Sequence, residues 1–319
     1  MPIPYFDAHC DTGTHALAGG QGLRANHCHL DLTRLVAYGP AAQVFAVFSR
    51  PEGHNWRAGY ENDDDAVALA AHGMACLDAL VRELEANADL AVICRSADEA
   101  RAAAAQGKTA AFLAIEGAEL LGSNIEGLQA AYGKGVRLVN LTWNYRNPLS
   151  GTNQTGGGLT EAGRAFVRAA QKLGVAVDMS HLSDEGFWDC LEISEKPILA
   201  GHSNARALCP HPRNLTDDMF VSLARAGGVA GLNLCPAFLG DDPDLDTCFA
   251  HIEHFLGLGG EKAVCLGSDF DGIDSPPRGI AGLQDMGELY ETLLRHNYPE
   301  DLVRDIFYNN LFSYLERAL

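Results

Sequence analysis

Eight short apolar runs, separated by stretches with helical periodicity, are the feature that most constrains the fold of this 319-residue chain. Each run is almost continuously hydrophobic, which is typical of strands buried on both faces of a parallel sheet. No internal repeat, low-complexity tract or linker divides the chain. The predicted strands are residues 5–10, 43–48, 109–115, 137–141, 175–180, 197–200, 229–234 and 264–267.

Eight strands that alternate with helices predict an α/β fold, a (β/α)8 TIM-like barrel spanning residues 1–319 as a single domain with C-terminal helices. A doubly wound open sheet is the alternative, because the number of strands does not distinguish the two. An extra apolar run at residues 90–94 and a long Ala-rich helix at residues 62–86 are expected additions to either fold.

Two helix ends carry clear local signals. Residues 159–174 predict an amphipathic helix that stops at Gly174, a residue suited to a left-handed C-terminal turn. Thr216, followed by Asp217 and Asp218, predicts an N-cap with acidic side chains in the first turn.

The charge balance excludes several classes of partner. Asp and Glu number 42 against 23 Lys and Arg, for a net charge of −19, so we expect no binding to nucleic acid or to anionic membranes. No apolar stretch approaches the ~20 residues that a membrane-spanning helix needs, and we expect no secretory signal at the start of the chain. Nine scattered cysteines without a CxxC pair favour a reducing, cytoplasmic location over a disulfide framework.

Polar residues with metal-ligating chemistry follow the predicted strands, where a barrel builds its functional site. Each of them alone has an ordinary structural explanation, such as a buried hydrogen bond or a helix cap. Together they predict a site for Zn²⁺ or a similar divalent ion, because imidazole and carboxylate ligands suit such ions. Six candidates lie at or just after the ends of five predicted strands. They are His9, Asp11, Glu116, His181, His202 and Asp269.

Other histidines and cysteines are weaker candidates. His27, Cys28, His29 and Asp31 resemble a metal cluster, but they precede a strand and are therefore expected at the opposite, structural end of the barrel. Cys10 alternates away from His9 and Asp11, so we expect it to pack in the core.

The motifs at these positions resemble those of the membrane (renal) dipeptidase family, zinc peptidases among the metal-dependent amidohydrolase-like barrels. The resemblance covers nearly the whole chain, in this order and spacing. It rests on FDAHCDT at residues 6–12, IEG at 115–117, residues 158–183 ending in VDMSHLS, GHSNARALCPHPRNLTDD at 201–218, and GSDFDG at 267–272.

The resemblance implies a binuclear zinc dipeptidase and a role for each residue. His9 and Asp11 would hold one zinc ion, His181 and His202 the other, and Glu116 would bridge both. Asp269, rather than Asp271, would carry a proton from water to the leaving amine. Arg213 would bind the C-terminal carboxylate of a small peptide substrate, for which a guanidinium is well shaped.

One position departs from the family pattern. Many members read Leu-Thr-His after the fourth strand, and that histidine helps to polarise the scissile carbonyl, whereas this chain has Trp143 there. An indole has one N–H donor and cannot become cationic. Either Trp143 or the adjacent Asn144 donates to the substrate, or the substrate differs from the usual dipeptide.

Several alternatives therefore stay open. The expected reaction is hydrolysis of L-Xaa-L-Xaa or L-Xaa-D-Xaa dipeptides. A related amidohydrolase acting on N-acyl amino acids, lactams or lactones is the first alternative, and a non-catalytic metal-binding protein is the second. The preferred substrate, the native metal and the oligomeric state, including a homo-oligomer, are not determined by the sequence.

Overall fold

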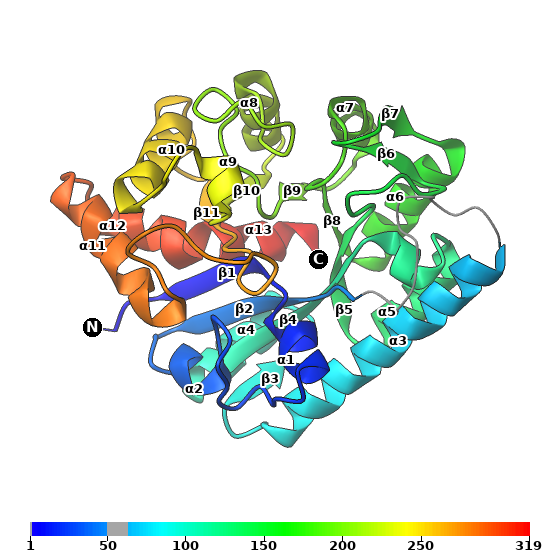
Figure 1. Ribbon diagram of the computed structural model, residues 1–319, viewed down its shortest axis with the longest axis horizontal. Coiled ribbons are helices and arrows are strands. Elements are labelled where there is room, and N and C mark those ends of the chain that lie inside the picture. Colours follow the sequence, from blue (N-terminus) through cyan, green and yellow to red (C-terminus); the bar gives the residue numbers. More distant parts are fainter. Residues whose placement is uncertain (1, 50–62) are drawn as a thin grey trace.

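Eight parallel strands close into a barrel in the computed structural model, which describes residues 2–49 and 63–319 (Figure 1). β1 pairs with both β2 and β11, and β2 pairs with β4, so the ring has no free edge. The predicted barrel is confirmed, and the doubly wound sheet is excluded. The eight strands of the barrel are β1 (Tyr5–Cys10), β2 (Ala41–Val47), β4 (Thr109–Glu116), β5 (Val136–Asn140), β8 (Ala176–Asp178), β9 (Leu199–Ala200), β10 (Val229–Leu232) and β11 (Val264–Leu266).

Three further strands lie outside the ring. The extra apolar run becomes β3 (Ala91–Ile93), which pairs with the first residues of β4, whereas β5 pairs with the last residues of that strand. A short antiparallel hairpin joins β6 (Ser150–Thr152) to β7 (Gly156–Leu159).

Helices surround the barrel, and the predicted helix ends are confirmed. Thr216 accepts a hydrogen bond from Met219 N, and Gly174 ends its helix with φ +78°. The long predicted helix begins at Asp63, and residue 62 lies outside the described residues. The helices are α1 (Thr12–Ala18), α2 (Leu32–Leu35), α3 (Asp63–Ala86), α4 (Ala97–Ala105), η2 (Ala118–Leu121), α5 (Ile125–Gly133), α6 (Glu161–Leu173), α7 (Asp184–Ile193), α8 (Asp217–Arg225), α9 (Pro236–Leu239), α10 (Leu245–Gly257), η3 (Leu283–Asp285), α11 (Met286–Arg295), α12 (Glu300–Arg304), η4 (Asp305–Asn309) and α13 (Asn310–Ala318).

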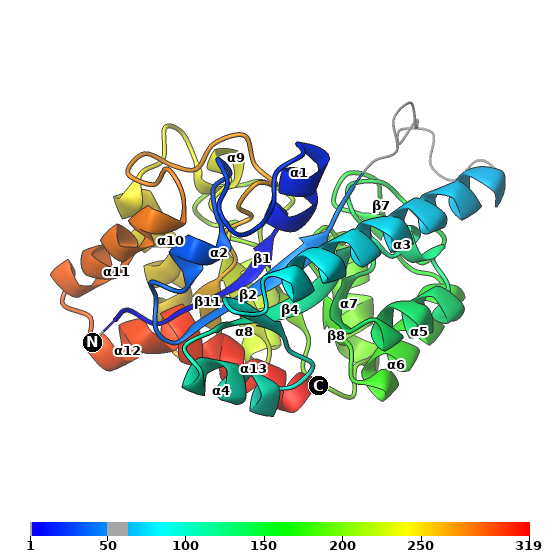
Figure 2. The same ribbon diagram turned by 90° about the horizontal axis from the view of Figure 1, so that it is seen from below.

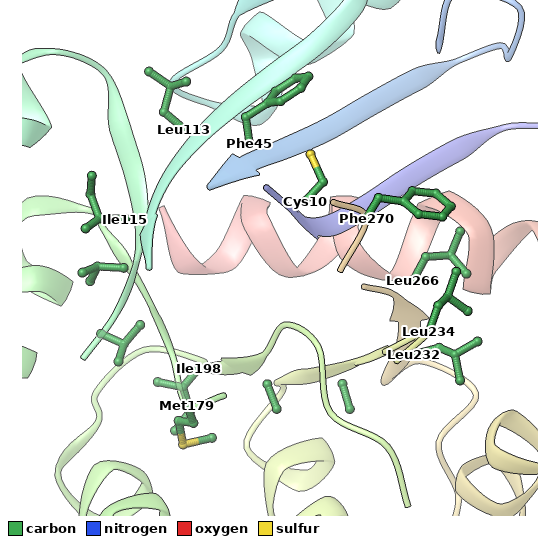
Figure 3. Packing of buried hydrophobic residues seen from close by; sticks show 14 of the residues in the cluster. Cys10, Phe45, Leu113, Ile115, Met179, Ile198, Leu232, Leu234, Leu266 and Phe270 are labelled. Atoms are coloured by element: carbon green, nitrogen blue, oxygen red, sulfur yellow. The ribbon is translucent and has the colours of Figure 1, made fainter. Parts of the chain in front are cut away.

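The alternation of side chains along β4 separates two hydrophobic layers. Ala111, Leu113 and Ile115 belong to the large cluster between the strands and the helices, part of which surrounds the barrel in Figure 3. Phe112 and its even-numbered neighbours belong to the second cluster, inside the barrel. Glu116 continues the even series, so its carboxylate faces the barrel interior.

The two ends of the barrel are unlike. α13 lies across the end where the strands begin: Asn310 Nδ2 donates to Val264 O at 2.8 Å, and Tyr314 Oη donates to Pro197 O at 3.3 Å. Figure 2 shows α4 and α13 on this side, and α1, α9 and β7 on the opposite side. Loops therefore surround the end where the strands finish. No helix of the described residues is both long and apolar enough to span a membrane.

Candidate metal centre

The five predicted metal ligands converge at the carboxyl end of the barrel. His9 lies within β1, Asp11 follows as the N-cap residue of α1, and Glu116 is the last residue of β4. His181 and His202 follow β8 and β9. All five side chains are buried, with exposed fractions of 6% or less. The structure therefore brings together side chains from four strands.

The spacing of the ligand atoms suits tetrahedral metal sites. Zinc bonds of about 2.0–2.1 Å place neighbouring ligand atoms about 3.3 Å apart. Glu116 Oε1 lies 2.9 Å from His181 Nε2 and 3.5 Å from His202 Nε2. The same oxygen lies 3.7 Å from His9 Nε2, which is 3.5 Å from Asp11 Oδ2. Glu116 Oε1 therefore lies among three imidazoles, as expected of a carboxylate that binds a metal ion.

Unsatisfied polar atoms point to a cation at the same place. His9 Nε2 and Asp11 Oδ1 are buried without a hydrogen-bond partner among the described residues. His181 Nε2 and His202 Nε2 lie 3.0 Å apart, close enough for one ion to bind both nitrogen atoms. Buried polar atoms of this kind normally have partners. The residues present therefore fit divalent metal ions.

Burial and mutual interaction set the protonation of these groups. Burial lowers the pKa of His181 to about 4, and the neighbouring Arg213 cation adds to the shift. Burial raises the pKa of Glu116, but the imidazoles outweigh it and the net pKa lies well below its ordinary value. Neutral imidazole and ionised carboxylate are the forms that bind metals.

The pKa values of His9 and Asp11 are shifted upward, in contrast to those of His181 and Glu116. Burial alone would lower the pKa of His9, but Glu116 and Asp11 outweigh it and the pKa lies well above its ordinary value. Burial and the nearby Glu116 carboxylate raise the pKa of Asp11 to about 7. Metal ions compete with protons for the same ligand atoms, so an ion bound at this pair would displace any proton held there.

The backbone adopts uncommon conformations around the centre. His181 and Asp269 have φ of +76° and +63°, in the left-handed region that side chains disfavour. A Cβ on Gly272 would lie 2.2 Å from Asp11 Oδ2 and 2.4 Å from Asp269 Oδ1. Glycine at position 272 therefore lets the loop pass close to both carboxylates.

Asp269, the predicted proton carrier, faces the ligands. Its Oδ1 lies 4.0 Å from His9 Nε2, and the ligand atoms of His9, Asp11 and Asp269 lie within 4.8 Å of one another. Burial raises the pKa of this carboxyl. Asp271 has different partners, because its carboxylate accepts hydrogen bonds from Thr12 Oγ1 and from the backbone N of His29.

The contact between His29 and Asp271 corrects one prediction. His29 was expected at the opposite end of the barrel because it precedes a strand, but its backbone N lies 2.8 Å from Asp271 Oδ1, beside the candidate centre. Asp271 N in turn donates to His29 Nδ1 at 3.0 Å. Residues 19–31 form part of the long connection after β1, and this loop folds over the carboxyl end before β2 begins.

Arg213 reaches the centre from the loop between β9 and α8. Its Nη2 lies 3.0 Å from His181 Nε2, and its guanidinium carbon lies 5.4 Å from the ring centroid of Phe238. The side chain is buried, and Nη1 has no hydrogen-bond partner within the part of the chain that the structure describes. A buried guanidinium with a free donor beside the ligands can bind an anionic group of a ligand.

Trp143 and Asn144 follow β5 at the same end. The Trp143 ring lies at a tilt to the rings of Phe48, Tyr145 and His181, with centroid distances of 4.7, 5.6 and 6.3 Å. Asn144 Oδ1 lies 2.8 Å from His181 Nδ1, so its acceptor oxygen fixes the orientation of that imidazole. The substrate-binding role of both residues stays a prediction.

Sequence reasoning missed the buried groups that support the ligands. Asp7 Oδ1 accepts hydrogen bonds from His9 N and Ser268 N, and Asp178 Oδ1 accepts from Ser180 N and Gly201 N. Each carboxylate thus ties together the strand ends that carry two site residues. A polar residue inside an apolar run was the available signal.

A fully buried asparagine was missed in the same way. Asn233 lies in the run predicted as the seventh strand and donates from Nδ2 to Asp269 Oδ2 at 3.0 Å. Its position next to the carboxyl end of β10 follows from the same rule that found the metal ligands.

The fold and the site together define a metal-dependent hydrolase built on a (β/α)8 barrel. Comparison with known proteins narrows this class. The sequence profile of the membrane dipeptidase family, peptidase family M19, matches residues 1–318. The chain belongs to this family and is a metallodipeptidase by class, which favours an enzyme over the non-catalytic alternative.

Known relatives agree with this membership. A protein of Schizosaccharomyces pombe described as an uncharacterized dipeptidase is 31% identical over 271 residues, which cover 82% of this chain and 64% of that protein. A metallopeptidase from Rhodobacter sphaeroides, solved with a phosphinate mimic of the dipeptide L-Ala-D-Ala, is 28% identical with a TM-score of 0.88, and all of both chains is covered. A solved dipeptidase of family M19 is 29% identical with a TM-score of 0.88, over 100% of this chain and 99% of that chain.

Proposed function

We propose that the protein is a binuclear zinc dipeptidase. His9 and Asp11 would hold one ion, His181 and His202 the other, and Glu116 would bind both. The observation that supports this most strongly is the position of Glu116 Oε1 within 3.7 Å of three imidazole Nε2 atoms. When bound, a pair of divalent ions lowers the pKa of water and polarises the carbonyl of the substrate.

The protein's own groups supply positioning and proton transfer. Arg213 would bind the C-terminal carboxylate of an L-Xaa-L-Xaa or L-Xaa-D-Xaa dipeptide through its buried guanidinium. Asp269 would take a proton from the attacking water and give it to the amine nitrogen as the C–N bond breaks. Support for this role comes from its buried carboxylate, which faces His9 at 4.0 Å.

An alternative substrate class is favoured by one observation. Trp143, with Phe48 and Tyr145 around it, presents aromatic surface where many relatives have a histidine. This surface would suit the acyl group of an N-acyl amino acid, or a lactam or lactone, better than it would suit a polar dipeptide end.

A panel of substrates tests both candidates. Release of free amino acids from L-L and L-D dipeptides is compared with hydrolysis of N-acyl amino acids, lactams and lactones, with Asp269→Asn as a control. We expect turnover of dipeptides and a large but measurable decrease of kcat in Asp269→Asn. Full activity in that variant would remove Asp269 from the mechanism, and a preference for the second group would replace the dipeptidase proposal.

The site of action and the assembly are also proposals. All nine cysteines are among the described residues and are free thiols, which supports a reducing, cytoplasmic location. A homo-oligomer that covers the loops of the carboxyl end remains a prediction, which the mass of the protein in solution tests.

A further inference from the structure

Three buried asparagines connect the loop that carries Arg213 to the carboxylate of Asp269. Asn204 and Asn214 lie in the segment between β9 and α8, and Asn233 follows β10. Each of the three side chains is at most 1% exposed. Buried amides are retained in a structure when all their groups have partners, and they then hold those partners in one geometry.

The side chain of Asn233 is saturated with hydrogen bonds. Nδ2 donates to Asp269 Oδ2 at 3.0 Å and to His202 O at 3.2 Å, which uses both of its hydrogens. Oδ1 accepts from Cys235 N at 2.6 Å. A flipped amide would place its oxygen against a carboxylate and a carbonyl, so these partners allow only one orientation.

Asn204 fixes the backbone of Asn233 from the other side. Its Oδ1 accepts from Asn233 N at 2.8 Å, and its Nδ2 donates to Asn233 O at 2.9 Å. The backbone N of Asn204 donates to Asn214 Oδ1 at 3.2 Å. Asn214 also donates from Nδ2 to Cys209 O at 2.9 Å and to Phe238 O at 2.8 Å. Asn214 is the neighbour of Arg213 in sequence, so the same hydrogen-bond network supports Arg213 and Asn233.

We propose that Asn233 is a positioning residue of the hydrolysis: by holding Asp269 Oδ2, it directs Oδ1 toward the water and the leaving amine. The inference rests on the proposed function, because it assigns the proton transfer to Asp269. Asn204 and Asn214 hold Asn233 at a fixed position relative to the loop of Arg213. The distance between Arg213, which would bind the substrate carboxylate, and Asp269, which would carry the proton, is fixed in this way.

The geometry explains why Asp269 needs such support. Its backbone lies in the left-handed region at φ +63°, and among the described residues its Oδ1 faces only weak contacts, the nearest imidazole nitrogen being 4.0 Å away. Without Asn233, rotation about the Cα–Cβ bond would let either oxygen turn away from the substrate. Catalytic groups need to be held close to the productive geometry.

The test compares Asn233→Ala with wild type on two substrates, L-Ala-D-Ala and its ester analogue L-alanyl-D-lactate. A hydrogen bond to a charged group contributes about 1.5–3 kcal/mol, so we expect kcat for the amide to fall roughly 10- to 100-fold with KM little changed. The ester should lose less, because an alkoxide leaves with less need for a proton than an amine does.

A double-mutant cycle separates positioning from general damage. In the Asp269→Ala background, Asn233→Ala should cause no further loss of kcat. Asn310→Ala is the matched control, because it removes a buried asparagine with two backbone acceptors at the opposite end of the barrel. We expect its kcat to equal that of wild type.

Each outcome decides the proposal. An unchanged kcat in Asn233→Ala, an equal loss on the amide and the ester, or a full additional loss in the Asp269→Ala background would each overturn it. If wild type hydrolyses no dipeptide, the proposed function fails and the inference with it. If wild type is active and Asn233→Ala matches it, only the inference fails.

Discussion

Replacing Arg213 by Met tests how the site would recognise a substrate. The side chain is 5% exposed, and its Nη1 lacks a hydrogen-bond partner among the described residues, so two parallel bonds to a carboxylate can form without breaking an ion pair. Each charge-assisted bond contributes about 1.5–3 kcal/mol, or roughly 3–6 kcal/mol for two. We expect kcat/KM for a dipeptide to fall about 10²- to 10⁴-fold in Arg213→Met.

The stability of the same variant should move in the other direction. Burial lowers the pKa of Arg213, because a charged guanidinium is poorly solvated there. Replacing a buried charge by an apolar side chain of similar size is often neutral or stabilising. The Tm of Arg213→Met without substrate should therefore equal or exceed that of wild type, as measured by thermal unfolding.

A substrate without a C-terminal carboxylate tests the same contact from the side of the substrate. Wild type should hydrolyse a dipeptide amide as poorly as Arg213→Met hydrolyses the dipeptide, and the variant should no longer distinguish the two substrates. Arg164→Met, which removes an ion pair to Asp189 between α6 and α7, is the control and should keep wild-type activity. If Arg213→Met lost activity equally on acid and amide, or if its Tm fell by several degrees, the carboxylate-binding role would be wrong.

Three further predictions concern two site residues, Trp143 and Glu116, and the buried carboxyl of Glu119 in η2. Trp143→His restores the residue common in relatives, and we expect kcat/KM for dipeptides to rise at least about tenfold, since a donor to the carbonyl is typically worth more than that; a decrease would show that the indole itself serves the substrate. If the wild type retains the two zinc equivalents of the proposed function after gel filtration, Glu116→Gln should retain one or fewer, measured by elemental analysis, and two retained equivalents in the variant would contradict the bridging role. Burial raises the pKa of Glu119 from 4.5 to about 7 in the folded protein. Between these pH values the carboxyl is ionised in the unfolded chain but still protonated in the folded protein, so the free energy of unfolding decreases as the pH rises. Denaturant unfolding at pH 5 and pH 8 should therefore show a decrease in the free energy of unfolding up to about 3 kcal/mol larger in wild type than in Glu119→Gln, and parallel profiles would contradict it.

The strands and the metal ligands could be predicted because their signals are local. Near-continuous apolar runs predict buried parallel strands, and β1 spans the residues predicted for it, Tyr5–Cys10. In a barrel the carboxyl ends of all strands meet at one rim. A polar residue directly after an apolar run can therefore be assigned to that rim even when none of its contacts is known. Glu116, His181 and His202 follow this rule, and His9 lies one residue before the end of its strand, which is why residues almost two hundred positions apart in sequence could be assigned to one site.

Loop contacts could not be predicted in this way. His29 was expected at the wrong end because its distance from the next strand says nothing of how a long connection folds back. Contacts with distant segments, such as those of His29 with Asp271 and Leu283, accompany that path and are not visible in the sequence. Asn233 was read as part of a strand, since its function depends on Asp269 Oδ2, which approaches from a different strand.

The sequence by itself determined the family, the alternation of strands and helices, and the residue types that can hold metal ions, because motifs, periodicity and strand-end position are properties of short segments. The tertiary structure alone decided which atoms meet: Glu116 among three imidazoles, Arg213 beside His181, and Asn233 on Asp269. The physical reason is that hydrogen bonds and metal ligation require the distances between side chains of distant segments to be correct to within a few tenths of an ångström. Only the packing of the whole barrel fixes those distances.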